Sequence, residues 1–536
     1  MRSFRLALLT STCLATSYAY IWPSPMLDEL ESTLYEILPS AASTISAFIQ
    51  PCDTFTGIAL DDTTGLGTGR SNIADWVRTA YHDMATHNVA DGTGGLDASI
   101  RFEEEQARAE NVGNGFSNTI NVLAGFSTRY TSIADTIALG LVFGVEFCGG
   151  PRVPFRGGRI DATEPNLPGV PEPEQTLDSH IASFARQGFT QEEMIGLVAC
   201  GHTFGGVQHA PFHDIVPELN DSDNTASVAH FDTTDVHFDN NIATEYMAGT
   251  TKNPLVVGFN ATTNSDKRIF GSDGNVTMRS FADSPKLFAS RCSELFARMI
   301  DTVPKGVQLS EVITPLPVKP GRIEFTLDGD ILQFTGDVRF WNLPSNPNRV
   351  ALLLWSDHLG ATHNSTLLPS LISTTDYPQG VATYYTLGAE DFSGISLDAK
   401  AGIVNMRFML DGELQTQQDT EAGVDFAVQD AVVFSTSSCF FENNETARYN
   451  MAVRNTAKVK SVYIETEMRD SSSHIGVTET DFFSPDPNAP VNAAYTIWTL
   501  NVAGSGFNRY VGAEIDGVKY TVLQLLSLFA LPSCTS

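Results

Sequence analysis

The sequence has few cysteines, few basic residues and no long apolar run. Seven cysteines stand among 536 residues, and 32 lysines and arginines face 63 aspartates and glutamates, for a net charge of −31. This charge excludes nucleic acids and anionic membrane surfaces as partners, because both would repel it. No internal stretch reaches the ~20 apolar residues of a membrane-spanning helix, so we expect no transmembrane segment.

The N-terminus has the pattern of a secretory signal. Arg2 and Arg5 precede the apolar run Leu6 to Leu9, and small residues up to Ala19 would permit cleavage before Tyr20. We therefore expect residues 1–19 to be a signal peptide and the protein to be secreted and extracellular. Its removal leaves six cysteines, an even number that indicates disulfides but allows fifteen pairings. Five Asn-x-Ser/Thr sequons would then be open to glycosylation: Asn220, Asn260, Asn275, Asn364 and Asn444.

Length and a change of pattern divide the chain into two domains. A chain of 536 residues is too long for one ordinary core. Apolar residues recur at helical spacing up to residue 303, whereas they alternate beyond residue 320, as in Ile323-Glu-Phe-Thr-Leu327. We predict a mainly α domain over residues 20–303, a Pro-rich linker over 304–320 and an all-β sandwich over 321–536. The predicted sandwich contains no chemical motif.

Arg78 and His82 are spaced to share one face of a helix, about one turn apart. An imidazole moves protons near neutral pH, and a guanidinium stabilises developing negative charge. The pair therefore suits acid–base chemistry on a small polar molecule. Alone, such a pair is more often part of a surface ion-pair face, so a second motif is required.

The second motif is a helix that runs into a histidine. Thr190 to Glu193 has the pattern of a capping box, which predicts a helix over Gln191–Ala199, directly before Cys200-Gly-His202-Thr. This segment and Arg78-Thr-Ala-Tyr-His-Asp83 resemble the proximal and distal histidine motifs of the plant-type haem peroxidase superfamily. The resemblance is to its secreted fungal, lignin-peroxidase-like class, and it covers about residues 30–310.

Shorter segments carry the same resemblance, in the order and spacing of that family. They are Gly95-Leu-Asp97-Ala-Ser99, Glu105 with Asn111, Pro154 to Ala162, Phe231 to Asp239, and Ser272-Asp273. The resemblance implies about ten helices in two halves around a b-type haem. It also implies that hydrogen peroxide is reduced to water while small phenolic or aromatic donors each lose one electron at the haem edge.

The resemblance assigns roles to particular residues. His82 would take a proton from hydrogen peroxide and return it to the leaving oxygen, while Arg78 would stabilise the charge there. Asn111 would hold the tautomer of His82, and Glu105 would anchor that loop. On the other side of the haem, His202 would be the axial iron ligand and Asp273 would accept its second N–H.

Two calcium sites are also implied, one beside each histidine. The distal set is Asp83, the Gly95 carbonyl, Asp97 and Ser99. The proximal set is Thr203, Asp232, Thr234, the His237 carbonyl and Asp239. Carboxylate, hydroxyl and carbonyl oxygens are the ligands that calcium prefers.

Some positions depart from the family pattern. Tyr81 stands where this class has phenylalanine, so a phenol would lie beside the distal histidine. Of three carboxylates in manganese peroxidases, Asp75 alone remains, with Ser71 and Gln208 at the other two positions. The surface tryptophan of lignin peroxidases corresponds to Leu197. Direct oxidation of small donors at the haem edge is the remaining route.

Two other functions stay open. A weak or inactive haem module could serve a β domain that attaches to a cell-wall polymer, or the enzyme could remove peroxide without a dedicated donor. We expect a monomer. The disulfide connectivity stays open: Cys52 could pair with Cys148, and Cys439 could pair with Cys534 inside the β domain. Cys200 is expected to be a buried free thiol, although Cys292 is a possible partner.

Overall fold

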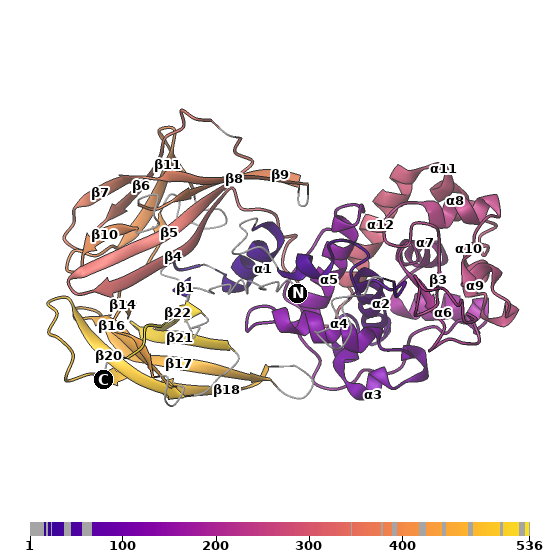
Figure 1. The fold of residues 1–536 in the computed structure, drawn as a ribbon, viewed down its shortest axis with the longest axis horizontal. Coiled ribbons are helices and arrows are strands. Elements are labelled where there is room, and N and C mark those ends of the chain that lie inside the picture. Colours follow the sequence, from indigo (N-terminus) through magenta and orange to yellow (C-terminus); the bar gives the residue numbers. More distant parts are fainter. Residues whose placement is uncertain are drawn as a thin grey trace, which may run out of the picture. The chain divides into compact units, whose positions relative to one another are not determined.

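A computed structural model describes residues 16–17, 20–22, 24–36, 44–55, 67–344, 346–376, 379–388, 394–416, 425–441, 446–469, 475–503, 508–524 and 531–534. The chain forms two compact units, one helical and one of β-strands (Figure 1). Pro25 to Thr314 make the helical unit, and the β unit combines residues up to Ser24 with Pro315–Asp470 and Ile475–Ser536. In the described part of the chain, no helix has the length and apolar character to span a bilayer.

The helical unit confirms the predicted mainly α domain. Its helices are α1 (Pro25–Tyr35), α2 (Asn72–Met84), α3 (Glu103–Gln106), α4 (Gly115–Leu123), α5 (Ile133–Phe147), α6 (Leu177–Gln187), α7 (Gln191–Gly201), α8 (Asn241–Ala248), α9 (Pro254–Val257), α10 (Ser265–Phe270), α11 (Val276–Asp283) and α12 (Pro285–Ile300). A two-stranded ribbon, β2 (Gly206–Gln208) with β3 (Val228–His230), follows α7.

Helix α5 is the buried centre against which α2 packs. All its residues except Phe147 are buried, in keeping with its apolar sequence. Two glycines allow the close approach of neighbouring side chains: a Cβ at Gly140 would lie 2.7 Å from Leu123, and one at Gly144 would lie 2.9 Å from Ile73. This packing fixes the position of α2, which carries Arg78 and His82.

Helix α7 begins as the sequence predicts. The Thr190 hydroxyl accepts a hydrogen bond from the Glu193 N–H, and the Glu193 carboxylate accepts one from the Thr190 N–H. Near its other end, a disulfide joins Cys200 to Cys292 on α12. The expected free thiol at Cys200 is therefore wrong. The other two possible bridges, Cys52–Cys148 and Cys439–Cys534, are both present.

The predicted linker over residues 304–320 is not a spacer. Ser310 donates its N–H to the carbonyl of Gly157, and Ile313, which is buried, donates to that of Phe155, both at 2.9 Å. Strand β4 (Val318–Asp328) of the β unit begins inside the predicted linker. Prolines favour extended backbone and lack only their own N–H, so the other residues of a proline-rich segment can still form backbone hydrogen bonds with a neighbouring segment.

The β unit confirms the predicted β-rich second domain. Its strands are β1 (Thr16–Ser17), β4 (Val318–Asp328), β5 (Ile331–Trp341), β6 (Ala351–Ser356), β7 (Thr362–Thr366), β8 (Leu368–Asp376), β9 (Gln379–Thr386), β10 (Ile395–Asp398), β11 (Asn405–Leu410), β12 (Glu413–Leu414), β13 (Phe426–Ala427), β14 (Val432–Ser435), β15 (Cys439–Phe441), β16 (Thr446–Arg454), β17 (Val459–Arg469), β18 (Ile475–Phe482), β19 (Ser484–Pro485), β20 (Tyr495–Ala503), β21 (Asn508–Ile515) and β22 (Val518–Gln524).

The largest sheet of the β unit has ten strands: eight follow the path β19-β20-β16-β14-β4-β5-β9-β8, while β10 pairs with β5 and β15 with β16. One core combines apolar residues of this sheet, such as Phe334, with residues of the β12-β11-β6-β7 sheet, such as Phe408. A second core combines Tyr449 of the large sheet with Ile464 of the β1-β22-β21-β17-β18 sheet. The unit therefore has two sandwich cores that share one sheet, where the sequence predicts a single sandwich.

The segment that follows the expected signal peptide belongs to the β unit. Tyr20 is buried against Trp22 and Phe426, and Ile21 donates its N–H to the carbonyl of Ala427 at 2.8 Å. The predicted domain boundaries of 20–303 and 321–536 are corrected accordingly. Of the expected signal peptide, only residues 16 and 17 are among the described residues, and Asn444 lies outside them.

Candidate active site

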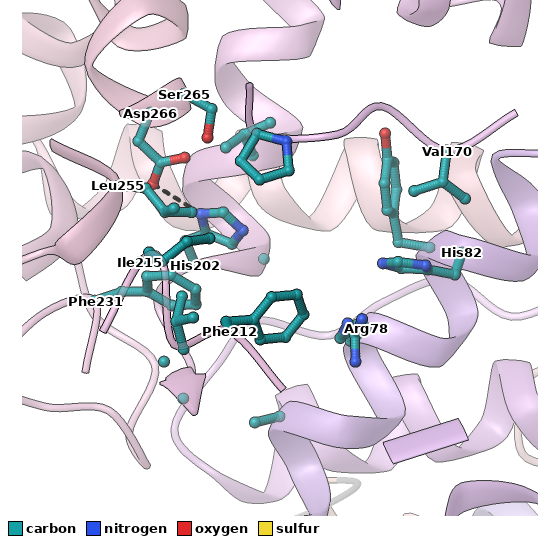
Figure 2. A pocket seen from close by; sticks show the side chains of 18 of the residues that line it. Arg78, His82, Val170, His202, Phe212, Ile215, Phe231, Leu255, Ser265 and Asp266 are labelled. Carbon is teal, nitrogen blue, oxygen red and sulfur yellow. Dashed lines mark hydrogen bonds and ion pairs between the residues drawn. The ribbon is translucent and has the colours of Figure 1, made fainter. Parts of the chain in front are cut away.

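A cavity of about 520 Å³ lies between residues of α2 and α7. Figure 2 shows Arg78 and His82 on one side of it and His202 on the other. Much of the remaining lining is apolar, with Phe212, Ile215 and Leu255 among its residues. A cavity with a largely apolar lining and a few convergent polar groups is the usual form of a cofactor site.

His82 is held by one nitrogen and leaves the other for chemistry. Its Nδ1 lies 2.8 Å from Oδ1 of Asn111, whose Nδ2 donates to the carbonyl of Glu105 at 2.8 Å. The amide of Asn111 is thereby oriented as an acceptor, so Nδ1 of His82 carries the proton and Nε2 is a free base. Burial lowers the pKa of His82 well below its ordinary value, and the nearby charge of Arg78 lowers it further. His82 is therefore neutral at physiological pH.

Arg78 brings a positive charge to the same side of the cavity. Its guanidinium donates to the carbonyl of Val112 at 3.0 Å and lies 4.4 Å from the ring centre of Phe116. Burial lowers the pKa of Arg78 to about 10, so the side chain remains charged at neutral pH. A fixed cation beside a neutral base can stabilise negative charge while the base moves a proton.

On the opposite side, His202 is oriented by Asp266. Nδ1 of His202 lies 2.8 Å from Oδ2 of Asp266, which also accepts a hydrogen bond from Asn253 at 2.8 Å. The ring of Phe231 stacks on the imidazole with centroids 4.1 Å apart. A carboxylate on one ring nitrogen fixes the tautomer and makes the other nitrogen a better metal ligand. The two histidines fit an iron cofactor bound between them.

The assignment of Asp273 as the partner of His202 is wrong. Asp273 caps α11, because its carboxylate accepts from the N–H groups of Val276 and Thr277 at 3.0 and 2.9 Å. Asp266, seven residues earlier, makes the contact with His202 that was expected of Asp273. Both aspartates follow a serine, as Ser265-Asp266 and Ser272-Asp273. The dipeptide alone therefore does not show which aspartate reaches His202.

Tyr81 lies beside His82 in the lining of the cavity. Its ring stacks on Phe184 and meets His82 edge-on, with centroids 5.8 and 6.0 Å apart. The phenol oxygen is 3.5 Å from Oε1 of Gln187, and burial raises the pKa of the phenol. Tyr81 is therefore a neutral phenol at physiological pH.

The predicted distal calcium ligands lie together, but their side-chain oxygens already accept hydrogen bonds. Oδ2 of Asp83 accepts from the N–H groups of Asp97 and Ala98 at 2.9 and 2.7 Å, and its Oδ1 accepts from the N–H of Ile100 at 2.9 Å. Burial and the neighbouring Asp97 raise the pKa of Asp83 well above its usual range.

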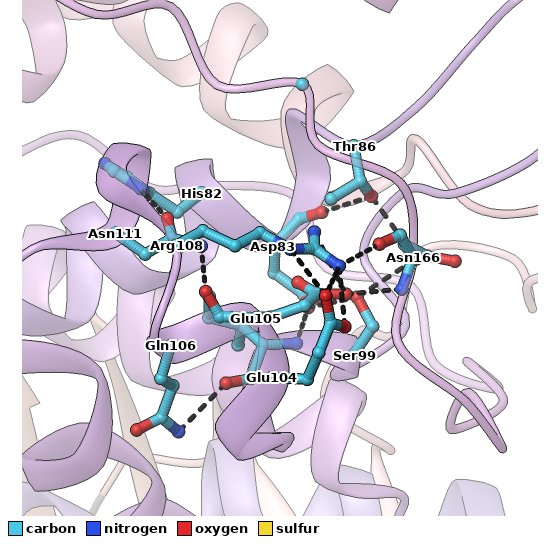
Figure 3. Close-up of polar contacts among 12 residues, drawn as sticks. His82, Asp83, Thr86, Ser99, Glu104, Glu105, Gln106, Arg108, Asn111 and Asn166 are labelled. Carbon is cyan, nitrogen blue, oxygen red and sulfur yellow. Dashed lines mark hydrogen bonds and ion pairs between the residues drawn. The ribbon is translucent and has the colours of Figure 1, made fainter.

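Asn166, which the sequence analysis missed, points its side-chain amide at the remaining oxygens of this set. Its Nδ2 is 2.9 Å from both carboxylate oxygens of Asp97 and 3.0 Å from Oγ of Ser99 (Figure 3). The backbone turns at Gly95, with φ +123°, and its N–H donates to Thr86. This donor arrangement does not fit a calcium ion, since N–H groups take the oxygens that would face it.

The proximal set fits a cation better. Oδ1 of Asp232 accepts from the N–H of Thr234 at 2.9 Å, whereas its Oδ2 is buried without a partner. Burial, with the charges of Asp239 and Glu245, raises the pKa of Asp232 to about 7. The Thr203 hydroxyl donates to the carbonyl of Asp239 at 2.9 Å, and His237 donates its N–H to the carbonyl of Thr234 at 2.7 Å. A buried carboxylate oxygen without a donor is what a hard cation would satisfy.

The described residues contain no group of three or more His, Cys, Asp or Glu side chains placed to hold a metal ion.

The positions that match a manganese site keep one carboxylate, and that carboxylate is paired with an arginine. Asp75, Ser71 and Gln208 all line the cavity, but the carboxylate of Asp75 is paired with Arg70 at 2.8 Å. These three positions therefore provide no pair of free carboxylates that could bind Mn(II).

Comparison with known proteins identifies relatives of the helical unit. A family model described as peroxidase matches residues 60–284. A WSC domain-containing protein of Arthroderma benhamiae is 38% identical over 363 residues, which are 66% of this chain and 48% of that protein. Putative L-ascorbate peroxidase 6 of Arabidopsis thaliana is 32% identical over 142 residues, 25% of this chain and 42% of that protein.

A mitochondrial cytochrome c peroxidase of Yarrowia lipolytica is 33% identical over 136 residues, 24% of this chain and 39% of that protein. The chain thus spans about half or less of the length of the curated relatives it matches. The matches to the two peroxidases are shorter than the helical unit, whereas the match to the WSC domain-containing protein is longer than the 290 residues from Pro25 to Thr314.

Proposed function

Because residues 60–284 belong to the plant-type peroxidase superfamily, we propose that this chain is a secreted haem peroxidase. It reduces hydrogen peroxide to two molecules of water, and two small phenolic or aromatic donors each supply one electron. The observation that carries this proposal is the pair of histidines on opposite sides of one cavity, each held through Nδ1 by an acceptor.

A b-type haem would lie between His202 and His82 and supply the iron at which the peroxide bond breaks. Nε2 of His202 would bind that iron, with Asp266 increasing the negative character of the imidazole. His82, neutral because of its burial, takes the first proton of hydrogen peroxide and returns it to the departing oxygen. Arg78 stabilises the negative charge on that oxygen, a role worth about 3 kcal/mol in comparable sites.

The donors are small molecules oxidised at the haem edge. Manganese is disfavoured as a donor because Asp75 is paired with Arg70. Leu197, which corresponds to the surface tryptophan of lignin peroxidases, is buried and offers no oxidisable ring. We propose one calcium ion, at the proximal loop, where Oδ2 of Asp232 has no donor.

Secretion remains part of the proposal. Its support is that the six cysteines outside the expected signal peptide pair in three disulfides, which persist in oxidising compartments. Glycosylation at the sequons would follow from secretion. The assignment to the secreted fungal class is likewise a proposal, since the peroxidases named above are ascorbate and cytochrome c peroxidases.

Attachment to a cell-wall polymer is a second candidate role, through the β unit. It is supported by the separate cores of that unit and by a relationship to the WSC domain-containing protein that extends beyond the helical unit. In this role the peroxidase would be weak or silent. Peroxide removal without a dedicated donor is a third reading, which a donor panel that includes Mn(II) would test.

The test uses the full chain loaded with haem. It should show a Soret band and oxidise a phenolic dye only when hydrogen peroxide is present. His82→Ala should retain the Soret band and slow the reaction with peroxide by about 10²–10⁴-fold, because the base is lost. His363→Ala, a matched change in the β unit, should leave the rate unchanged. Haem binding without turnover in the unaltered protein would refute the enzymatic proposal and favour attachment.

A further inference from the structure

Asn166 lies in the loop between α5 and α6, where the polar contacts of the distal side converge (Figure 3). Its Nδ2 is within 3.0 Å of three oxygens, two on Asp97 and one on Ser99, and 3.3 Å from the hydroxyl of Thr86. These contacts come from residues on both sides of the Gly-rich turn at Gly95. One side chain thus joins the elements that the sequence expects a calcium ion to join.

An amide and a cation cannot both occupy this position. The oxygens of Asp97 and Ser99 that face Nδ2 are those that would have to face calcium at 2.3–2.6 Å. The carboxylate of Asp83 is not available instead, since backbone N–H groups of the same loop point at both of its oxygens. The N–H donors therefore hold the oxygens of this loop together, as a bound cation would.

The backbone of Asn166 leads from this loop to the catalytic histidine. Its N–H donates to Oε1 of Glu105, and its carbonyl accepts from Arg108, both at 2.5 Å. The carbonyl of Glu105 in turn orients the Asn111 amide that holds His82. Asn166 touches neither the cavity histidines nor any reacting atom, so its part is to position Asn111.

We propose that Asn166 takes the place of the distal calcium ion and positions Asn111 against His82, so that this side of the pocket needs no metal. The proposal rests on the proposed function only for the role of His82. The site occupied by the amide is defined by Asp97, Ser99 and Thr86, independently of any turnover.

Calcium content gives the first test, measured by mass spectrometry on haem-loaded protein after dialysis against calcium and then against metal-free buffer. Asp232→Asn should remove the proximal ion and leave no calcium. Adding Asn166→Asp to that variant should create one site, because a carboxylate replaces the amide. Asn121→Asp, the same chemical change on an exposed position of α4, should create none. Calcium retained by Asp232→Asn at one ion per haem, or no gain with Asn166→Asp, would overturn the proposal.

The pH profile of the reaction with peroxide gives the second test. Asn166→Ala should lower the rate constant about tenfold, the equivalent of one hydrogen bond, and move the acid limb of the profile as the Asn111 contact to His82 loosens. Asn166→Asp should be slow in a chelator and recover with added calcium. A profile and rate identical to the unaltered protein for Asn166→Ala would overturn the positioning role. An inactive unaltered protein would instead refute the proposed function, and the calcium counts would still decide this inference.

Discussion

Replacement of Asp266 by asparagine changes a single charge behind His202. In the structure, Oδ2 of Asp266 is 2.8 Å from Nδ1 of His202, and the aspartate is almost fully buried. Asparagine keeps the size and can still accept through its amide oxygen, so the imidazole should stay in place. What is lost is the negative charge, which makes the histidine electron-rich and stabilises the oxidised iron.

The size of the effect follows from the hydrogen bond. A bond to a charged acceptor contributes roughly 1.5–3 kcal/mol and one to a neutral acceptor roughly 0.5–1.5 kcal/mol, so the loss is about 1.5 kcal/mol. For a one-electron couple, about 1.4 kcal/mol corresponds to about 59 mV. The reduction potential of the Fe(III)/Fe(II) couple should therefore rise by about 60 mV in Asp266→Asn.

Spectroelectrochemical titration of the haem-loaded protein measures this potential directly. Asp273→Asn is the matched control, because the family motif predicts Asp273 as the partner of His202 but its carboxylate accepts from N–H groups at the start of α11. It should leave the potential unchanged and lower the free energy of unfolding by less than about 1 kcal/mol, because asparagine keeps one of the two acceptor oxygens at the start of α11. A potential that rises in Asp273→Asn and stays constant in Asp266→Asn would refute the assignment of Asp266.

Three further predictions concern the same helical unit. Burial and Arg78 lower the pKa of His82, so the rate constant with peroxide should stay level as the pH falls from 8 through 6.5 and decline only in more acid solution. A midpoint at or above pH 6.5 in stopped-flow measurements would contradict this. Chelation should slowly alter the Soret band of the unaltered protein through loss of the proximal ion. In Asp232→Asn the band should be indifferent to chelator. The double variant Cys200→Ser with Cys292→Ser should lose about 2–5 kcal/mol of stability in urea unfolding, because the bridge closes a loop of 92 residues. A loss below about 1 kcal/mol would show that helix packing alone holds α7 on α12.

The distal half of the site could be predicted from the sequence because its geometry is local. Arg78 and His82 share a face of one helix by spacing, and the Thr190–Glu193 capping box fixes where α7 starts, hence where His202 falls. Asn111 could be placed by its offset from Glu105 in the family motif, and the structure puts it 2.8 Å from His82. These relationships depend on helix periodicity and short turns.

The proximal half could be predicted only in part, because its partners are set by tertiary packing. Two Ser-Asp pairs stand seven residues apart, and which one reaches His202 depends on how α10 packs against α7. Cys200 and Cys292 meet because α7 and α12 lie together, which no spacing in the sequence shows. Asn166 belongs to a loop without periodicity and reaches the distal turn across 67 residues, from Ser99.

In the β region, alternation predicts strands but not their order. Strand β4 pairs in parallel with β14, more than a hundred residues later, and the pairing places both cores on one shared sheet. Period-2 patterning states only which side chains face a core. It carries no information on which strand lies next to which, and so one sandwich was expected where the structure has two joined cores.

The β unit is built from both ends of the chain, which bears on any role assigned to it. Tyr20, at 4% exposure, fills part of the core beside Phe426, and Ile21 extends the hydrogen bonding of Ala427. In sequence, the helical unit is thus an insertion between this segment and β4. A fragment of residues 321–536 would leave the Phe426 side of the core open to water and would lack the first part of β4. Attachment to a polymer must therefore be measured on the full chain, because weak binding by the fragment would report its incomplete core rather than the surface of the protein.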